Sequence, residues 1–142
     1  MASRLMSNSL NIQTILGLDP GRDKCGVAVM NNEQKVLYHQ IINSQNAIAI
    51  IQKLAREFAI DLIVMGDGTT SKIWQEQIDS IATMPVVTVN ETNSTLEARD
   101  RYWILYPPKG LRRMIPRGLR VPPRPVDDIV AILLIERYLD LN

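Results

Sequence analysis

Short apolar runs separated by polar turns occupy the first third of the chain. The runs Thr14–Leu18, Gly26–Met30 and Lys35–Asn43 have the length and composition of β-strands. The polar link 31–34 is typical of a hairpin connection, and the Asp19-Pro20-Gly21 sequence predicts a tight reversal of the chain. We therefore expect these three strands to form an antiparallel meander.

The spacing of apolar positions becomes helical after residue 46. Ala47, Ile51, Leu54 and Phe58 lie on one predicted helix face, and Asn46 can cap that helix. The elements expected after it alternate between strand and helix: a strand at Asp61–Met65, a helix at 73–82, a strand at Pro85–Val89, and helices at 94–105 (capped by Ser94) and 128–139. Helical crossovers between strands imply parallel pairing. The pattern predicts one α/β domain, a five-stranded mixed sheet whose first three strands are antiparallel, flanked by helices.

The start of the chain is polar, and we expect a flexible N-terminus at residues 1–13 and one domain at 14–142. No apolar run approaches the ~20 residues that span a bilayer, and the first residues lack the apolar centre of a signal peptide. The single cysteine, Cys25, excludes an internal disulfide framework and is typical of a small buried hydrophobe. We expect a cytoplasmic protein without a membrane partner.

The net charge of +1 suggests no partner, but the cations are unevenly distributed. The Pro-rich segment 107–125 contains six cations and no acid: Lys109, Arg112, Arg113, Arg117, Arg120 and Arg124. Guanidinium groups pair well with phosphate, and each neutralised phosphate adds salt-dependent affinity for nucleic acid. The segment therefore predicts a stiff, positive loop that contacts nucleic acid. The alternative is a solvated loop whose arginines pair with acids of the same domain.

Three carboxylates lie at positions where a functional role is a reasonable alternative to a purely structural one. Asp19 ends the first strand, Glu91 follows the fifth, and Asp127 or Asp128 opens an apolar helix. A turn, a loop and a helix N-terminus explain each of them singly. Functional groups of such sheets, however, collect beyond the carboxyl ends of parallel strands. Carboxylates gathered there repel one another, and their hard oxygen ligands suit Mg²⁺ or Mn²⁺.

Weaker candidates follow the predicted strand Asp61–Met65. The segment 66–71 is interpreted mainly as a strand-to-helix turn, with a phosphate contact from Thr69 or Thr70 as a secondary role. Asp67 is a candidate extra acid at the site. The single histidine, His39, is interpreted as structural, and the aromatic residues are too few and scattered to predict a base-stacking platform.

Four segments in order resemble successive blocks of the YqgF/RuvX family, RNase H-like nucleases related to the RuvC Holliday junction resolvases. They are ILGLDPGRDKCGVAV, DLIVMGDG, VNETNSTLEAR and VDDIVAILLIERYL, and they extend the resemblance over about Ile15 to Leu139. The resemblance implies an RNase H-like fold. It also implies that Asp19, Glu91 and Asp127 are the metal-binding catalytic acids, with Asp128 following the third.

The resemblance further implies a metal-dependent nuclease that uses Mg²⁺ or Mn²⁺ on structured nucleic acid. RNA is the favoured partner, with a role in ribosome biogenesis through processing of the 5′ end of precursor 16S ribosomal RNA. Branched DNA is the second substrate class, for a Holliday junction resolvase-like endonuclease, and either a monomer or a homodimer fits. Many members carry Asp-Glu-Arg where this chain has Asn90-Glu91-Thr92. That departure motivates a third hypothesis, a non-catalytic nucleic-acid-binding member of the fold.

Overall fold

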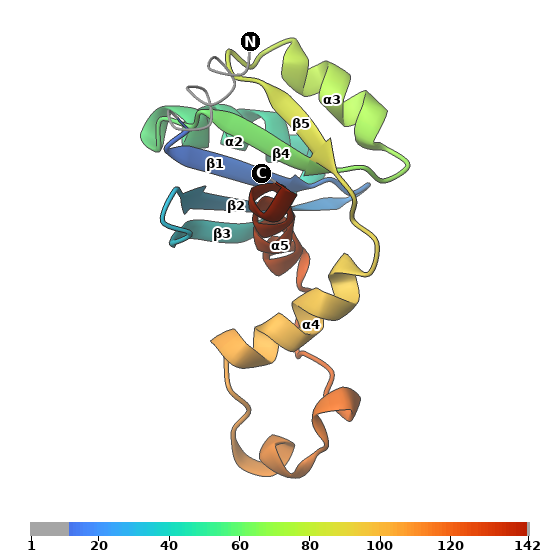
Figure 1. The fold of residues 1–142 in the computed structure, drawn as a ribbon. Coiled ribbons are helices and arrows are strands. Elements are labelled where there is room, and N and C mark those ends of the chain that lie inside the picture. Colours follow the sequence, from blue (N-terminus) through green and yellow to red (C-terminus); the bar gives the residue numbers. More distant parts are fainter. Residues whose placement is uncertain (1–11, 142) are drawn as a thin grey trace.

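The computed structural model describes residues 12–141, and its centre is a five-stranded sheet (Figure 1). The strands are β1 (Thr14–Asp19), β2 (Lys24–Asn31), β3 (Val36–Asn43), β4 (Leu62–Gly66) and β5 (Val86–Val89). Their order across the sheet is β3-β2-β1-β4-β5. The first three strands pair antiparallel, and β4 and β5 extend the sheet in parallel from β1. The predicted mixed sheet is confirmed.

Helices cover both faces of this sheet. The α-helices are α2 (Ala47–Glu57), α3 (Ser71–Asp79), α4 (Ser94–Leu105) and α5 (Asp127–Leu141). Three short 3-10 helices are η1 (Ser44–Asn46), η2 (Gly110–Met114) and η3 (Arg117–Leu119). Figure 1 shows α5 crossing one face of the sheet, with α4 directed away from it.

Two hydrophobic layers lie on opposite faces of the sheet because side chains alternate along each strand. Ile15 belongs to the layer beneath α4 and α5, whereas Leu16 and Leu18 belong to the layer beneath α2 and α3. The first half of α5 is buried almost completely. It lies so close to β1 that a Cβ at Gly17 would overlap the Ala131 carbonyl oxygen. Close contact with the central strand fixes the position of α5.

Helix starts differ from the sequence predictions in three places. Asn46 precedes α2 but makes no side-chain capping hydrogen bond. Asn93, at a left-handed φ of 61°, occupies the cap position of α4, so the buried Ser94 is the first helical residue and not the cap. The last helix begins at Asp127, one residue earlier than predicted. Cap geometry depends on the approaching backbone, which the spacing of apolar residues does not specify.

Most of the predicted flexible N-terminus, residues 1–13, lies outside the described residues. Where the described chain begins, it is tied to the domain. The backbone N–H of Gln13 donates to the Asp61 carboxylate at 2.8 Å, and that of Asn32 donates to the Gln13 carbonyl at 2.9 Å. None of the helices in the described part of the chain has the length and apolar character needed to cross a membrane.

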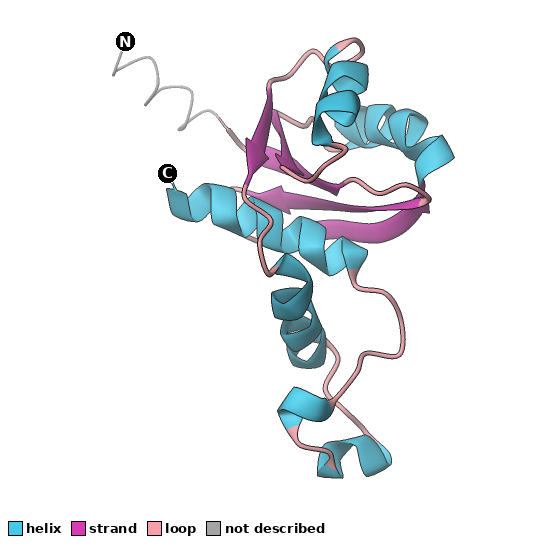
Figure 2. Cartoon of the chain, turned by 90° about the vertical axis from the view of Figure 1, so that its right-hand side faces the viewer, coloured by secondary structure: helices cyan, strands magenta, loops and turns pink. Residues whose placement is uncertain are grey.

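The segment 107–125, called here the basic arm, projects away from the sheet together with the end of α4 (Figure 2). Most of its residues are exposed, including large apolar ones such as Leu111 and Met114, which are 82% and 81% exposed. Its shape comes from η2, η3 and backbone contacts of Arg120. The Arg120 guanidinium donates to the carbonyls of Arg112, Arg113 and Ile115 at 2.9 to 3.2 Å. The predicted loop is therefore a projecting structure with its own internal hydrogen bonds.

Candidate active site

Asp19, Glu91 and Asp127 come from distant parts of the sequence and meet at one end of the sheet. Because β1, β4 and β5 are parallel, their carboxyl ends share an edge, and Asp19 is the last residue of β1. Burial, and after it the charges of Asp127 and Glu91, together raise the pKa of Asp19 from 3.8 to about 7. The structure thus brings the three predicted acids into electrostatic contact.

Asp127 is placed by a glycine on the neighbouring strand. Gly26 pairs with Asp19 across the β1–β2 ladder. A Cβ at Gly26 would overlap the backbone of Asp127, so only glycine permits the start of α5 to come this close. Burial and the charge of Asp128 raise the pKa of Asp127, and the nearby Lys24 partly offsets this. Lys24 is a cation at the site that sequence reasoning missed.

Asp128 faces a different environment from its neighbour. Asp128 is 3% exposed, and its carboxylate accepts hydrogen bonds from Arg124 at 2.9 and 3.3 Å. His39 Nδ1 on the edge strand β3 lies 2.7 Å from Asp128 Oδ2. Burial acts to raise the pKa of Asp128, but the hydrogen bonds from Arg124 and His39 hold it below its usual range. The position of the two aspartates in the sequence left both open; in the structure the charge of Asp127 acts on Asp19, whereas Asp128 is an ion-pair residue.

Glu91 lies in a space that two glycines leave free. A Cβ at Gly66 or at Gly68 would overlap the Glu91 carboxyl group. Burial and the charge of Asp67 raise the pKa of Glu91, and Arg137 acts in the opposite direction. The Asp67 carboxylate accepts the backbone N–H of Glu91 at 3.2 Å. Asp67, predicted as an extra acid, therefore lies beside Glu91 and holds its backbone.

Arg137 holds the loop that carries Glu91. Its guanidinium donates to the carbonyls of Asn90 at 2.6 Å and of Thr92 at 2.8 Å, and it pairs with Glu97 at 3.2 Å. Sequence reasoning did not identify this role of Arg137. No feature of the sequence connects it to residues 90–92, because the contact depends on how α5 crosses the sheet.

The secondary candidates Thr69 and Thr70 remain on the surface. Residues 66–71 form the predicted turn between β4 and α3, in which the Ser71 N–H donates to the Gly68 carbonyl at 3.0 Å. Both threonines are exposed, and Thr70, at the cap position, makes no side-chain capping bond. They are accessible to a ligand, and nothing in the fold requires their hydroxyl groups.

The donor set at this edge is made of carboxylate oxygens, the ligands that Mg²⁺ and Mn²⁺ prefer. Within residues 12–141, no group of three Asp, Glu, His or Cys side chains converges in the way that would hold a metal ion. Asp19, Glu91 and Asp127 fit such an ion by donor chemistry and by the mutual repulsion that a cation would neutralise. The three carboxyl groups are close enough for the charges of Asp127 and Glu91 to act on Asp19.

The six cations of the basic arm fall into two groups. Arg124 pairs with Asp128, and its guanidinium carbon lies 5.4 Å from the centroid of the Tyr102 ring and 5.8 Å from that of Tyr106. Arg120 is engaged by backbone carbonyls. The other four have no ion-pair partner within the described chain: Lys109, Arg112, Arg113 and Arg117. Internal pairing with acids, the alternative drawn from the sequence, therefore applies in residues 12–141 to Arg124 only.

A hollow of about 250 Å³ connects the basic arm with the acids. Thr95 and Arg99 of α4 line one side of it, and the end of the arm with Asp127 lines the other. Of the three acids, Asp127 lines this hollow, beside the cations Arg99 and Arg124. The two halves of the candidate site, cations and acids, are contiguous.

Solved structures with the same architecture include two proteins in complex with Holliday junctions. RuvC of Thermus thermophilus, solved with a Holliday junction substrate, is 14% identical, with a TM-score of 0.57 over 92% of this chain and 96% of that one. The fowlpox virus resolvase, solved with Holliday junction DNA, is 13% identical, with a TM-score of 0.57 over 90% and 97%. These similarities show a RuvC-type, RNase H-like fold, as the sequence predicted.

Sequence comparison gives the family. No curated protein matches the chain at a significant level. The family model described as the Tex protein YqgF-like domain matches residues 13–97, which include the whole sheet with Asp19 and Glu91. The predicted relationship to YqgF proteins is thereby confirmed, and the chain belongs to the Tex protein YqgF-like domain family.

Proposed function

We propose that this protein is a divalent-metal-dependent nuclease that hydrolyses phosphodiester bonds in structured nucleic acid. One observation carries the proposal: Asp19 at the end of β1, Glu91 after β5 and Asp127 at the start of α5 lie near one sheet edge, and the other two charges raise the pKa of Asp19. A protein gains no stability from gathering like charges, so the arrangement favours a function. The RuvC-type fold supports the same class of chemistry.

The three carboxylates would hold Mg²⁺ or Mn²⁺. When bound, such an ion would supply Lewis-acid activation of water and would neutralise charge on the phosphate. The surrounding residues keep the acids in place: Gly66 and Gly68 leave room for the Glu91 carboxyl group, and Arg137 fixes its loop. Arg124 and His39 hold Asp128, and with it the start of α5 that bears Asp127.

The basic arm supports a polyanionic substrate. Its four exposed cations without ion-pair partners in the described chain would contact phosphates beside the acids. Precursor 16S ribosomal RNA is the favoured substrate because of the resemblance to YqgF/RuvX proteins. Branched DNA is the second, because the RuvC and fowlpox virus structures contain Holliday junctions.

Cleavage assays test the proposal. End-labelled precursor ribosomal RNA and a four-way DNA junction are each incubated with the protein and Mg²⁺ or Mn²⁺. We expect metal-dependent cleavage that Asp19→Asn reduces at least a hundredfold. Asp23→Asn, which changes an exposed acid of the neighbouring turn, is the matched control and should cleave normally. Equal rates for the wild type and Asp19→Asn would show that a contaminant cleaves, and would refute the assignment.

A non-catalytic nucleic-acid-binding module is the second candidate. It is favoured by the loop 90–92, where Asn90 and Thr92 supply no acid or cation beside Glu91, and by the absence of a converged three-ligand group among residues 12–141. Calorimetric titration with Mn²⁺ separates the two candidates. Binding that Asp19→Asn abolishes supports the nuclease, whereas nucleic-acid binding without any Mn²⁺ binding supports the module.

A further inference from the structure

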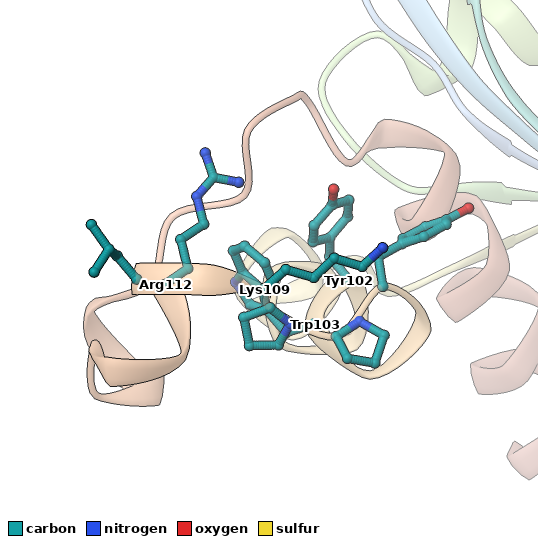
Figure 3. A pocket seen from close by; sticks show the side chains of 8 residues that line it. Tyr102, Trp103, Lys109 and Arg112 are labelled. Carbon is teal, nitrogen blue, oxygen red and sulfur yellow. The ribbon is translucent and has the colours of Figure 1, made fainter.

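A second hollow, of about 490 Å³, opens where the end of α4 meets the basic arm (Figure 3). Tyr102, Trp103 and Tyr106 form aromatic walls, and the cations Lys109 and Arg112 lie at the same hollow. The volume is within the range of small-molecule sites in proteins. The acids assigned to catalysis do not line it, so it is a separate feature of the molecule.

The aromatic walls suit a flat, unsaturated ring. The Tyr102 and Trp103 rings meet edge to face, with centroids 5.0 Å apart, and the Tyr106 ring lies 5.1 Å from that of Tyr102. Tyr106 is 43% exposed, so this aromatic side chain remains accessible to a ligand. Three of the seven aromatic residues gather here, although the sequence suggested that they were too scattered for base stacking.

Trp103 contributes an unused hydrogen-bond donor. Its side chain is a wall of the hollow and is only 7% exposed, and the buried indole Nε1 has no hydrogen-bond partner in the described chain. Buried donors in native structures nearly always have a partner, and those without one call for an explanation. A ligand with an acceptor atom on its ring would supply the partner.

The charge of the hollow selects an anion. No acidic side chain lines it, and the Arg112 guanidinium carbon lies 6.0 Å from the centroid of the Trp103 ring. Lys109 has no ion-pair partner within residues 12–141. An aromatic ring with acceptor atoms, attached to a phosphate, matches the walls, the indole donor and the cations together. A nucleotide has this combination of groups.

Arg124 places this hollow next to the acid cluster. Its guanidinium contacts the Tyr102 and Tyr106 rings on one side and the Asp128 carboxylate, adjacent in sequence to Asp127, on the other. A strand whose base enters the hollow can therefore continue along the arm toward the carboxylates.

We propose that this hollow binds an unpaired nucleobase of the nucleic-acid substrate, with Lys109 and Arg112 on the flanking phosphates. The class of ligand rests on the proposed function. The base stacks on the aromatic walls and accepts the Trp103 N–H, while the phosphates meet the cations. The protein would then prefer substrates with a single-stranded or displaced nucleotide next to the cleavage position.

Binding of two matched single-stranded oligonucleotides, one with bases and one without, tests this inference without any cleavage. A short labelled single strand and an abasic strand of equal length are titrated by fluorescence anisotropy, with metal removed by chelation. We expect the wild type to bind the base-bearing strand about tenfold more tightly, because each stacked base contributes to affinity. Tyr106→Ala should bring this ratio close to one, and Trp103→Phe should reduce it about threefold by removing the N–H. Equal binding of the two strands by the wild type overturns the proposal.

Matched variants separate the hollow from general charge attraction. Arg112→Gln should weaken binding of the base-bearing strand more than Arg117→Gln, which changes an exposed arginine that does not line the hollow. Ile104→Ala, an exposed change on the same helix, should leave the base-to-abasic ratio unchanged. A ratio that Tyr106→Ala leaves intact, in a variant with normal melting temperature, places the base elsewhere and overturns the proposal.

Two further measurements identify the source of the base and separate this inference from the proposed nuclease activity. Adenosine monophosphate that competes as strongly as the single strand would assign the hollow to a free nucleotide and overturn the assignment to a strand. Base-dependent binding without cleavage in any metal would refute the nuclease and support the hollow. Cleavage with equal binding of both strands would support the nuclease and refute the assignment of the hollow to a base.

Discussion

The carboxylate edge and the basic arm are adjacent, but they are built in opposite ways. At the carboxylate edge, Gly26 touches the Asp127 backbone, and Gly66 and Gly68 enclose the Glu91 carboxyl group. On the arm, Cβ atoms at Gly110 and Gly118 would meet nothing within 4 Å. An added Cβ in the first region would meet the Asp127 backbone or the Glu91 carboxyl group, whereas the second region has open space at both glycines.

The difference shows what each region must achieve. Under the proposed function, acids that act on one phosphate would require fixed positions, and strands and a buried helix provide such positions here. Contacts with a flexible polyanion require reach and positive charge more than fixed geometry, and an exposed arm provides both. Four substitutions test this contrast, in order of decreasing effect on the free energy of unfolding.

Gly26→Ala should have the largest effect. The added Cβ overlaps the backbone of Asp127 and forces α5 away from the sheet, at a cost of about 3 kcal/mol. Gly118→Ala on the arm has open space and should change stability by less than about 0.5 kcal/mol. Urea denaturation of both variants measures the difference. Similar midpoints for the two would show that the carboxylate edge is not the rigid region.

Asp128→Ala breaks the ion pair that joins the arm to the body. It leaves Arg124 and His39 without their shared carboxylate, at a cost of about 2 kcal/mol at neutral pH. The folded pKa of Asp128 is lowered, so its contribution is present above pH ~4 and is lost as the pH falls through the folded pKa. Denaturation midpoints between pH 2 and 8 should therefore converge for wild type and variant in acid. Lys53→Ala, which removes an exposed pair, should cost under about 0.5 kcal/mol.

Asp19→Asn should stabilise the protein while it removes activity. The folded pKa of Asp19, about 7, is above its usual value, so the ionised carboxyl group destabilises the fold increasingly between pH ~4 and ~7. Without metal, the variant should be more stable by about 2 kcal/mol at pH 8 and equal to the wild type near pH 4. Thermal unfolding of both proteins across this pH range checks the direction of the stability difference. A variant less stable than the wild type at pH 8 would contradict electrostatic strain at the carboxylate edge.

Arg113→Gln should have the smallest effect on the fold. The side chain is exposed and forms no ion pair in the described chain, so stability should change by less than about 0.5 kcal/mol. Affinity for nucleic acid should fall, and the slope of log affinity against log salt should decrease by roughly one for each lost phosphate contact. Titrations of nucleic acid at several salt concentrations measure this slope. An unchanged slope would exclude Arg113 from the nucleic-acid interface.

The sheet and its two layers were predictable because their information is local. The short apolar run Thr14–Leu18 predicted β1, and the turn residues after it marked the strand end. The positions of Asp19 and Glu91 followed from the rule that parallel strands end at one edge. No local pattern distinguished Asp127 from Asp128, because both lie at the start of one helix.

The remaining details depend on contacts between segments far apart in sequence. His39 meets Asp128, and Arg137 meets the loop 90–92, only after α5 has packed on the sheet. The clustering of Tyr102, Trp103 and Tyr106 with Arg112 depends on how the arm folds back on α4. Their residue types were visible in the sequence, but their geometry was not.

The late position of α5 in the chain has a consequence for biosynthesis. During translation, the strands and Asp19 emerge from the ribosome well before α5. Until α5 arrives, one apolar face of the sheet stays uncovered and Asp19 lacks the neighbouring charge of Asp127. The proposed metal site would therefore be incomplete in the nascent chain until α5 packs on the sheet. Packing of α5 would then cover this face of the sheet and complete the proposed site in the same step.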